Sequence, residues 1–166
     1  MNKSLALLLA VSGLVWANQG QAAEPITFNQ YRDGINKIDW QARTISFEKF
    51  EKDRLKSDVT VLDLRSEAEY KQGHLKGAKL IGADIKEEKL KELVPNKKTE
   101  IIVYCTNTFF PSRRMALNTV CLPQIVALGY NNTYVLEDIW TKSGSDMRSI
   151  ETLKKSGLWE GETTER

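Results

Sequence analysis

Two short segments of this chain, Val59–Leu64 and Ile101–Tyr104, are almost entirely apolar and rich in β-branched residues. Such segments suit strands that are buried on both faces, as in a parallel sheet covered by helices. Three shorter strand patterns accompany them, at Thr44–Ile45, Lys79–Gly82 and Thr133–Leu136. Helical patterns of about ten residues separate the strands, and this alternation is typical of α/β folds. We therefore expect a central, mostly parallel five-stranded sheet flanked by helices.

Cap residues indicate where the intervening helices begin and end. Ser46 and Ser66 precede helical patterns and are expected to be N-caps. The helices predicted further along the chain cover Ile85–Leu93, Ser112–Leu128 and Met147–Lys155. Gly129 is a natural residue just past the end of the second of these helices, although Pro123 could break that helix early. Residues 73–78 contain two glycines and predict a turn.

Length and composition favour one globular domain. The chain has 166 residues, enough for a hydrophobic core without disulfides or metals. Its formal net charge is only +2, and lysines are interleaved with acids, so we expect no nucleic-acid partner. We divide the chain into a signal peptide (1–22), an N-terminal leader segment (23–43), the folded domain (44–156) and a C-terminal tail (157–166).

The first residues have the layout of a secretory signal peptide. One lysine precedes the apolar run Leu5–Val15, which is too short to span a bilayer as a helix. Small residues at Gly20 and Ala22 predict cleavage after Ala22, with cleavage after Ala17 and an uncleaved anchor as alternatives. We therefore expect a periplasmic or secreted protein that keeps no stable membrane anchor after cleavage.

Cys105 directly follows the apolar strand Ile101–Tyr104 and precedes a predicted helix start at Ser112. Ligands of open α/β sheets bind at the carboxyl ends of the strands, where this cysteine is expected. Loop amides and the positive end of a helix would lower the pKa of its thiol and favour the reactive thiolate. The alternative is a small buried residue at a strand end, because free cysteines are often buried.

A disulfide with Cys121, the second cysteine, is not expected. If a helix begins at Ser112, Cys121 lies nine residues further on, roughly 13 Å along the axis. A disulfide requires Cα atoms within about 7 Å. Cys105 is therefore expected to be free, unless Pro123 ends the helix early and lets Cys121 fold back. Cys121 itself is either a core residue or a distant redox partner.

Several motifs together resemble rhodanese-like domains. The resemblance covers about residues 44–142. It rests on Val61-Leu62-Asp63-Leu64-Arg65, Glu69-Tyr70, Gly73-His74-Leu75, Gly77-Ala78, Ile101–Tyr104 with Cys105, Leu128-Gly129-Tyr130, Val135-Leu136 and Trp140. The run from Asp63 to Ala78 is the most specific part.

The resemblance implies a three-layer fold and a catalytic Cys105 that accepts sulfane sulfur as a persulfide. It also implies an active-site loop whose amides hold this persulfide; the loop comprises Thr106, Asn107, Thr108, Phe109, Phe110, Pro111 and Ser112. The partners would be a sulfane-sulfur donor, such as thiosulfate or a persulfide, and a thiol acceptor, which can belong to a protein. No cofactor and no metal are implied. Asp63 and Arg65 are expected to be structural residues near the site, and His74 to bond to the backbone.

The chain departs from the family pattern in two places, one in the active-site loop and one after the last strand. Where many rhodaneses have an arginine, this chain has Phe110, and the next cations are Arg113 and Arg114, which could bind an anion. A variant group of the family has a second cysteine at that position, followed by a serine that matches Ser112. This chain resembles that group but has no second cysteine in the loop. Glu137-Asp138 replaces a Gly-Gly pair, and these acids would oppose a thiolate and anionic donors.

Two functions are consistent with the sequence. One is a sulfurtransferase or persulfide carrier. The alternative is a catalytically silent rhodanese-like module in the bacterial envelope that binds a protein partner through exposed Phe109 and Phe110. A related cysteine phosphatase would need an arginine six residues after Cys105, and Pro111 occupies that position.

Overall fold

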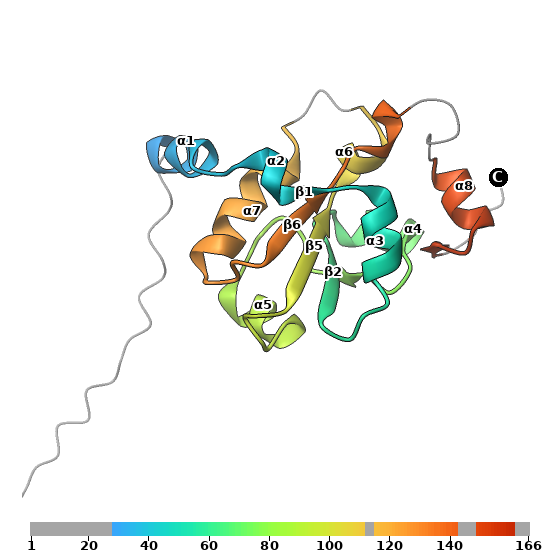
Figure 1. The fold of residues 1–166 in the computed structure, drawn as a ribbon, viewed down its shortest axis with the longest axis horizontal. Helices are drawn as coiled ribbons and strands as arrows, with labels where there is room; N and C mark the ends of the chain where they lie inside the picture. Colours follow the sequence, from blue (N-terminus) through green and yellow to red (C-terminus); the bar gives the residue numbers. More distant parts are fainter. Residues whose placement is uncertain (1–27, 112–114, 143–148, 162–166) are drawn as a thin grey trace, which may run out of the picture.

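The computed structural model describes residues 28–111, 115–142 and 149–161 (Figure 1). The predicted signal peptide (1–22) and the predicted residues Ser112, Arg113 and Arg114 lie outside the described residues. Within the described residues, no helix is both long enough and apolar enough to cross a membrane.

The core of the fold is a five-stranded sheet in the order β1-β6-β5-β2-β4, and all four strand pairings are parallel. The strands are β1 (Thr44–Ile45), β2 (Val59–Asp63), β4 (Lys79–Leu80), β5 (Glu100–Tyr104) and β6 (Thr133–Leu136). This confirms the predicted α/β class and the five predicted strands. The central strand is β5, so the residue that follows it lies between the carboxyl ends of β2 and β6.

Helices cover both faces of this sheet and complete the three-layer arrangement (Figure 1). The helices are α1 (Phe28–Asn36), α2 (Trp40–Arg43), α3 (Phe47–Asp53), α4 (Glu67–Gln72), α5 (Glu87–Leu93), α6 (Thr106–Phe109), α7 (Leu117–Ala127) and α8 (Ile150–Lys155), with a 3₁₀ turn, η1, at Ile139–Thr141. The predicted caps Ser46 and Ser66 accept hydrogen bonds from the amides of Lys49 and Glu69. Gly129 follows α7 with φ of +90°, as expected for a residue just past a helix end.

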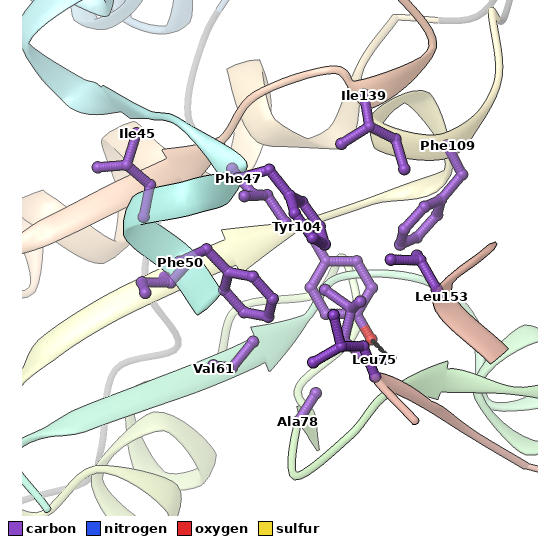
Figure 2. Close-up of a cluster of buried hydrophobic side chains, with 13 residues drawn as sticks. Ile45, Phe47, Phe50, Val61, Leu75, Ala78, Tyr104, Phe109, Ile139 and Leu153 are labelled. Carbon is purple, nitrogen blue, oxygen red and sulfur yellow. Dashed lines mark hydrogen bonds between the residues drawn. The ribbon is translucent and has the colours of Figure 1, made fainter. Parts of the chain in front are cut away.

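Alternate residues of β5 face the two layers, because side chains of a strand point to opposite sides. Ile102 and Tyr104 pack in one cluster with Phe47 of α3 and Leu153 of α8 (Figure 2). Ile101, Val103 and Cys105 belong to the other cluster, which holds the buried side of α5 and α7. The period of two therefore places Cys105 on the α7 side of the sheet.

The segment after Cys105 differs from the prediction. A short helix, α6, begins at once, and α7 begins at Leu117 rather than at Ser112. Phe110 ends α6 in an extended conformation, φ −142° and ψ 142°, because the residue before a proline is disfavoured in the helical region. Pro123 lies inside α7 without ending it, so burial of Leu122 and Ile125 outweighs the loss of one backbone hydrogen bond.

A second small sheet pairs β3 (His74–Leu75) with β7 (Trp159–Glu160) in antiparallel orientation. The sequence predicted only a turn at residues 73–78 and a tail from residue 157. The pairing partners are far apart in the chain and each strand has two residues, so periodicity gives no signal for them. An added Cβ at Gly73 would lie 2.2 Å from Nε1 of Trp159, which explains a glycine at this position. Trp159 and Glu160 therefore pack against the domain.

Candidate functional site

Cys105 lies at the carboxyl edge of the sheet and has no solvent-exposed surface. Backbone N–H groups on two sides of its sulfur favour negative charge there. Asn107 and Thr108 approach from α6, and Leu117 and Asn118 approach from the first turn of α7. Two helix N-termini thus converge on one sulfur atom, an arrangement that stabilises negative charge there.

The pKa of the Cys105 thiol is nevertheless raised, because burial outweighs the four amide donors. The predicted lowering of this pKa was therefore wrong, although amides do point at the sulfur as expected. Loss of hydration disfavours a thiolate more than these dipoles favour it. The amide cradle suits a sulfur anion, but the buried thiol is protonated at neutral pH.

Three hydrogen bonds fix the active-site loop. Thr106 Oγ1 donates to Glu69 Oε1 at 2.8 Å, and the Cys105 amide donates to Thr108 Oγ1 at 3.4 Å. The indole of Trp140, in η1, donates to the carbonyl of Asn107 at 2.7 Å. The loop is therefore attached to α4 on one side and to the turn after β6 on the other.

The two phenylalanines of the loop have different environments. Phe109 is buried and forms edge-on contacts with Tyr104 and Trp159, with ring centroids 5.5 and 5.2 Å away (Figure 2 shows Phe109 near Tyr104). The prediction that Phe109 is exposed was therefore wrong, because sequence alone gave no sign of the pairing with Trp159. Phe110 is 51% exposed, and Pro111 is exposed beside it.

Asp63 and Arg65 form a buried ion pair next to the loop. The Arg65 guanidinium donates to both Asp63 oxygens, at 2.6 to 3.1 Å, and to the carbonyl of Gly73 at 2.7 Å. Tyr104 donates its hydroxyl to Asp63 at 2.6 Å and accepts the amide of Leu75 at 3.2 Å. The pair thus joins β2 and β5 to the start of β3.

Aromatic rings surround the same guanidinium. The Arg65 Cζ atom lies 5.4 to 5.6 Å from the ring centroids of Tyr104, Phe109 and Trp159. Contacts of this kind stabilise a desolvated cation. The sequence marked Arg65 by its motif but gave no signal for Trp159.

His74 bonds to the backbone, as expected. Its Nδ1 lies 2.9 Å from the carbonyl oxygen of Tyr70, and its ring stacks on the Tyr70 ring at 3.7 Å. Nε2 lies 3.3 Å from a carboxylate oxygen of Glu160 in β7. The histidine thus holds β3 against α4 and β7, a structural position.

The two acids after β6 differ in their surroundings. Glu137 accepts the backbone amide of Phe47 at 2.9 Å and pairs with Lys142 at 2.8 Å. The pKa of Asp138 is raised by burial and by the neighbouring charge of Glu137. Lys142 balances the charge of Glu137. The Asp138 carboxylate is therefore the acid that would oppose a thiolate or an anionic donor near the loop.

Cys121 lies on the second turn of α7 and belongs to the same buried cluster as Cys105. Its thiol donates to the carbonyl of Ala83 at 3.5 Å. Burial and the proximity of Cys105 raise its pKa to about 12. Both cysteines are free, as expected, although α7 begins at Leu117 and not at the predicted Ser112.

Two pockets flank the first turn of α7. One has a volume of about 480 Å³ and lies toward β2 and β4; its lining includes Leu64, Ser66, Gly82 and Leu117. The other, here called the β6-side pocket, has a volume of about 320 Å³ and is lined by Trp40, Thr44, Ala116, Asn118, Thr119, Val135, Leu136, Glu137, Asp138 and Thr141. The sequence missed Leu117 and Asn118, because their role depends on where α7 begins.

Among the described residues, no group of three histidine, cysteine or acidic side chains could hold a metal ion.

A model of the rhodanese-like domain family matches residues 46–142. Among solved structures, the BH2092 protein from Bacillus halodurans is similar at a TM-score of 0.53 and 21% identity, over 80% of this chain and 85% of that chain. The rhodanese-like domain of the Alr3790 protein from Anabaena sp. is similar at 0.52 and 16% identity, over 75% of this chain and 83% of that chain. These two similarities show a shared fold. The comparison with curated proteins gave no match.

Proposed function

Because the chain belongs to the rhodanese-like domain family, we propose that it carries sulfane sulfur as a persulfide on Cys105 and passes it to a thiol. The observation that supports this most strongly is the convergence of four backbone amides on the Cys105 sulfur. The charged outer sulfur of a persulfide would lie one S–S bond from the Cys105 sulfur, within the field of these donors and of two helix N-termini. The covalent intermediate divides the transfer into two steps.

In the first step, the Cys105 thiol loses its proton, which the donor's leaving group takes up, and the resulting thiolate attacks the sulfane sulfur of the donor. The donor's S–S bond breaks, and its leaving group departs with the electron pair. In the second step, an acceptor thiolate attacks the outer sulfur of the Cys105 persulfide. The S–S bond to Cys105 breaks, the electron pair returns to its sulfur, and the acceptor leaves as a persulfide. No other group is oxidised or reduced.

The surroundings of Cys105 favour a persulfide donor over thiosulfate. Phe110 stands where many relatives have an arginine, and its exposed ring offers no charge to a dianion. Asp138, on the same edge of the sheet, repels anions further. We propose that the reaction takes place in the periplasm or outside the cell, on the strength of the signal-peptide pattern at residues 1–22.

A silent binding module is the second candidate, and specific observations favour it. Cys105 is wholly buried and its pKa is raised, so its nucleophilicity at neutral pH is low. Phe110 and Met115, which flank the end of the loop, are 51% and 62% exposed. Apolar side chains exposed on one loop suit contact with a protein partner.

Turnover separates these two functions. The purified protein is mixed with inorganic polysulfide and excess 2-mercaptoethanol, and transfer of sulfur to the thiol is followed over many cycles. Sulfur transfer should occur with the wild type and with Cys121→Ser, and should fall to the uncatalysed rate with Cys105→Ser. Equal rates for wild type and Cys105→Ser would exclude the enzyme and leave the binding module.

A further inference from the structure

We propose that the β6-side pocket is the acceptor subsite and that it selects a thiol that carries a primary ammonium group, an aminothiol. The proposal rests on the proposed function, because it names the class of acceptor for the same cysteine. Three observations carry it: an unpartnered acceptor atom, hydroxyl and indole donors that are already used, and a carboxylate that has no ion-pair partner among the described residues.

Asn118 connects the pocket to the reacting sulfur. Its backbone amide donates toward Cys105 Sγ from the second residue of α7, and the same residue lines the pocket. The same residue thus contributes both to the wall of the pocket and to the surroundings of the Cys105 sulfur. The 320 Å³ volume is at the small end of ligand pockets, which suits a small thiol.

Asn118 also has an unused hydrogen-bond acceptor. The residue is 5% exposed, and its Oδ1 has no partner among the described residues. A buried polar atom without a partner costs about 1–3 kcal/mol, so such atoms are rare in native folds and call for an explanation. A donor group on a ligand would satisfy this oxygen.

The hydroxyl and indole donors around the pocket are already used. The hydroxyls of Thr44, Thr119 and Thr141 each donate to a backbone carbonyl, at 2.6 to 2.7 Å. The indole of Trp40 donates to the carbonyl of Ile35 at 3.2 Å. These groups keep oxygen lone pairs and an aromatic ring for a ligand.

Asp138 supplies the charge. Lys142 pairs with the neighbouring Glu137, and no ion pair to Asp138 occurs among the described residues. An ammonium group in the pocket would meet the Asp138 carboxylate, and the ring of Trp40 could add a cation–π contact. An anionic thiol would meet the same carboxylate and be repelled. The lining thus distinguishes thiols by their charge.

The test starts from protein whose Cys105 persulfide has been verified by mass, and follows the loss of that persulfide with three small thiols. These are cysteamine, 2-mercaptoethanol and 3-mercaptopropionate, which carry a positive, a neutral and a negative group. Second-order rates are divided by the thiolate fraction of each thiol. We expect cysteamine to react about tenfold faster than 2-mercaptoethanol, and 3-mercaptopropionate to react slowest. Equal corrected rates would overturn the proposal.

Variants locate the preference. Asp138→Asn and Asn118→Leu should each lower the ratio of the cysteamine rate to the 2-mercaptoethanol rate about tenfold. Asp84→Asn is the matched control, because Asp84 lines the pocket on the other side of α7. A loss of preference in Asp84→Asn, with none in Asp138→Asn, would place the acceptor in that other pocket and refute the assignment.

Folding and the proposed function are controlled separately. Since Asn118 Oδ1 has no partner, Asn118→Leu should unfold at no lower temperature than the wild type. If that variant is unstable, Asp138→Asn alone decides the question. Failure of the persulfide to form contradicts the proposed function, whereas a persulfide that reacts with all three thiols alike contradicts only the aminothiol subsite.

Discussion

Replacement of Arg65 by methionine should cost about 3 kcal/mol of unfolding free energy. Arg65 is 6% exposed and Asp63 is fully buried, so the substitution leaves a carboxylate in the core without its cation. Breaking a buried ion pair from one side typically costs about 3–5 kcal/mol. Asp63 would keep the bond from the Tyr104 hydroxyl and the bond from the amide of residue 65, which places the loss at the lower end of that range.

Urea denaturation of the wild type and the variant, followed by tryptophan fluorescence, measures this loss. The matched control is Arg32→Met, because Arg32 and Asp33 form an ion pair with side chains 56% and 57% exposed. Exposed pairs contribute little, so the control should unfold like the wild type. If the two variants have equal m-values and Arg65→Met loses no more stability than Arg32→Met, the Asp63–Arg65 ion pair does not stabilise the fold. That result would refute the reasoning.

Three further outcomes follow from the same contacts. Gly73→Ala should lose more than about 1 kcal/mol and shift the fluorescence of Trp159, because φ is +151° and the new Cβ meets the indole; an unchanged spectrum would exclude this packing. Trp140→Phe removes the hydrogen bond that fixes the active-site loop, so iodoacetamide should alkylate Cys105 several-fold faster. In the wild type the pKa of Cys105 is raised by burial, so its alkylation rate should still be increasing above about pH 8.5. A plateau below that pH would mean that the amides outweigh burial.

Local patterns predicted much of the fold. The runs Val59–Leu64 and Ile101–Tyr104 predicted buried parallel strands because both faces of such strands must be apolar. Ser46 and Ser66 predicted helix starts because their hydroxyls satisfy backbone amides of the first turn. Cys105 then follows a central strand, so its place at the carboxyl edge followed from topology.

The remaining features depend on residues far apart in the chain. The pairing of β3 with β7 places Trp159 over Arg65 and buries Phe109, and no local pattern contains these contacts. The start of α7 at Leu117 decides which amides face Cys105. Burial raises the pKa of Cys105, and the backbone N–H dipoles lower it. Which effect is larger depends on the packing around the sulfur, and no local sequence pattern contains that information.

The central claim is that Cys105 holds a persulfide in the amide cradle. Its most direct test is peptide mass spectrometry of protein treated with inorganic polysulfide and then blocked with an alkylating reagent. We expect one added sulfur atom, about 32 Da, on the peptide that contains Cys105, in the wild type and in Cys121→Ser. We expect no added sulfur in Cys105→Ser. Unmodified Cys105 in the wild type, or sulfur found only on Cys121, would contradict the account.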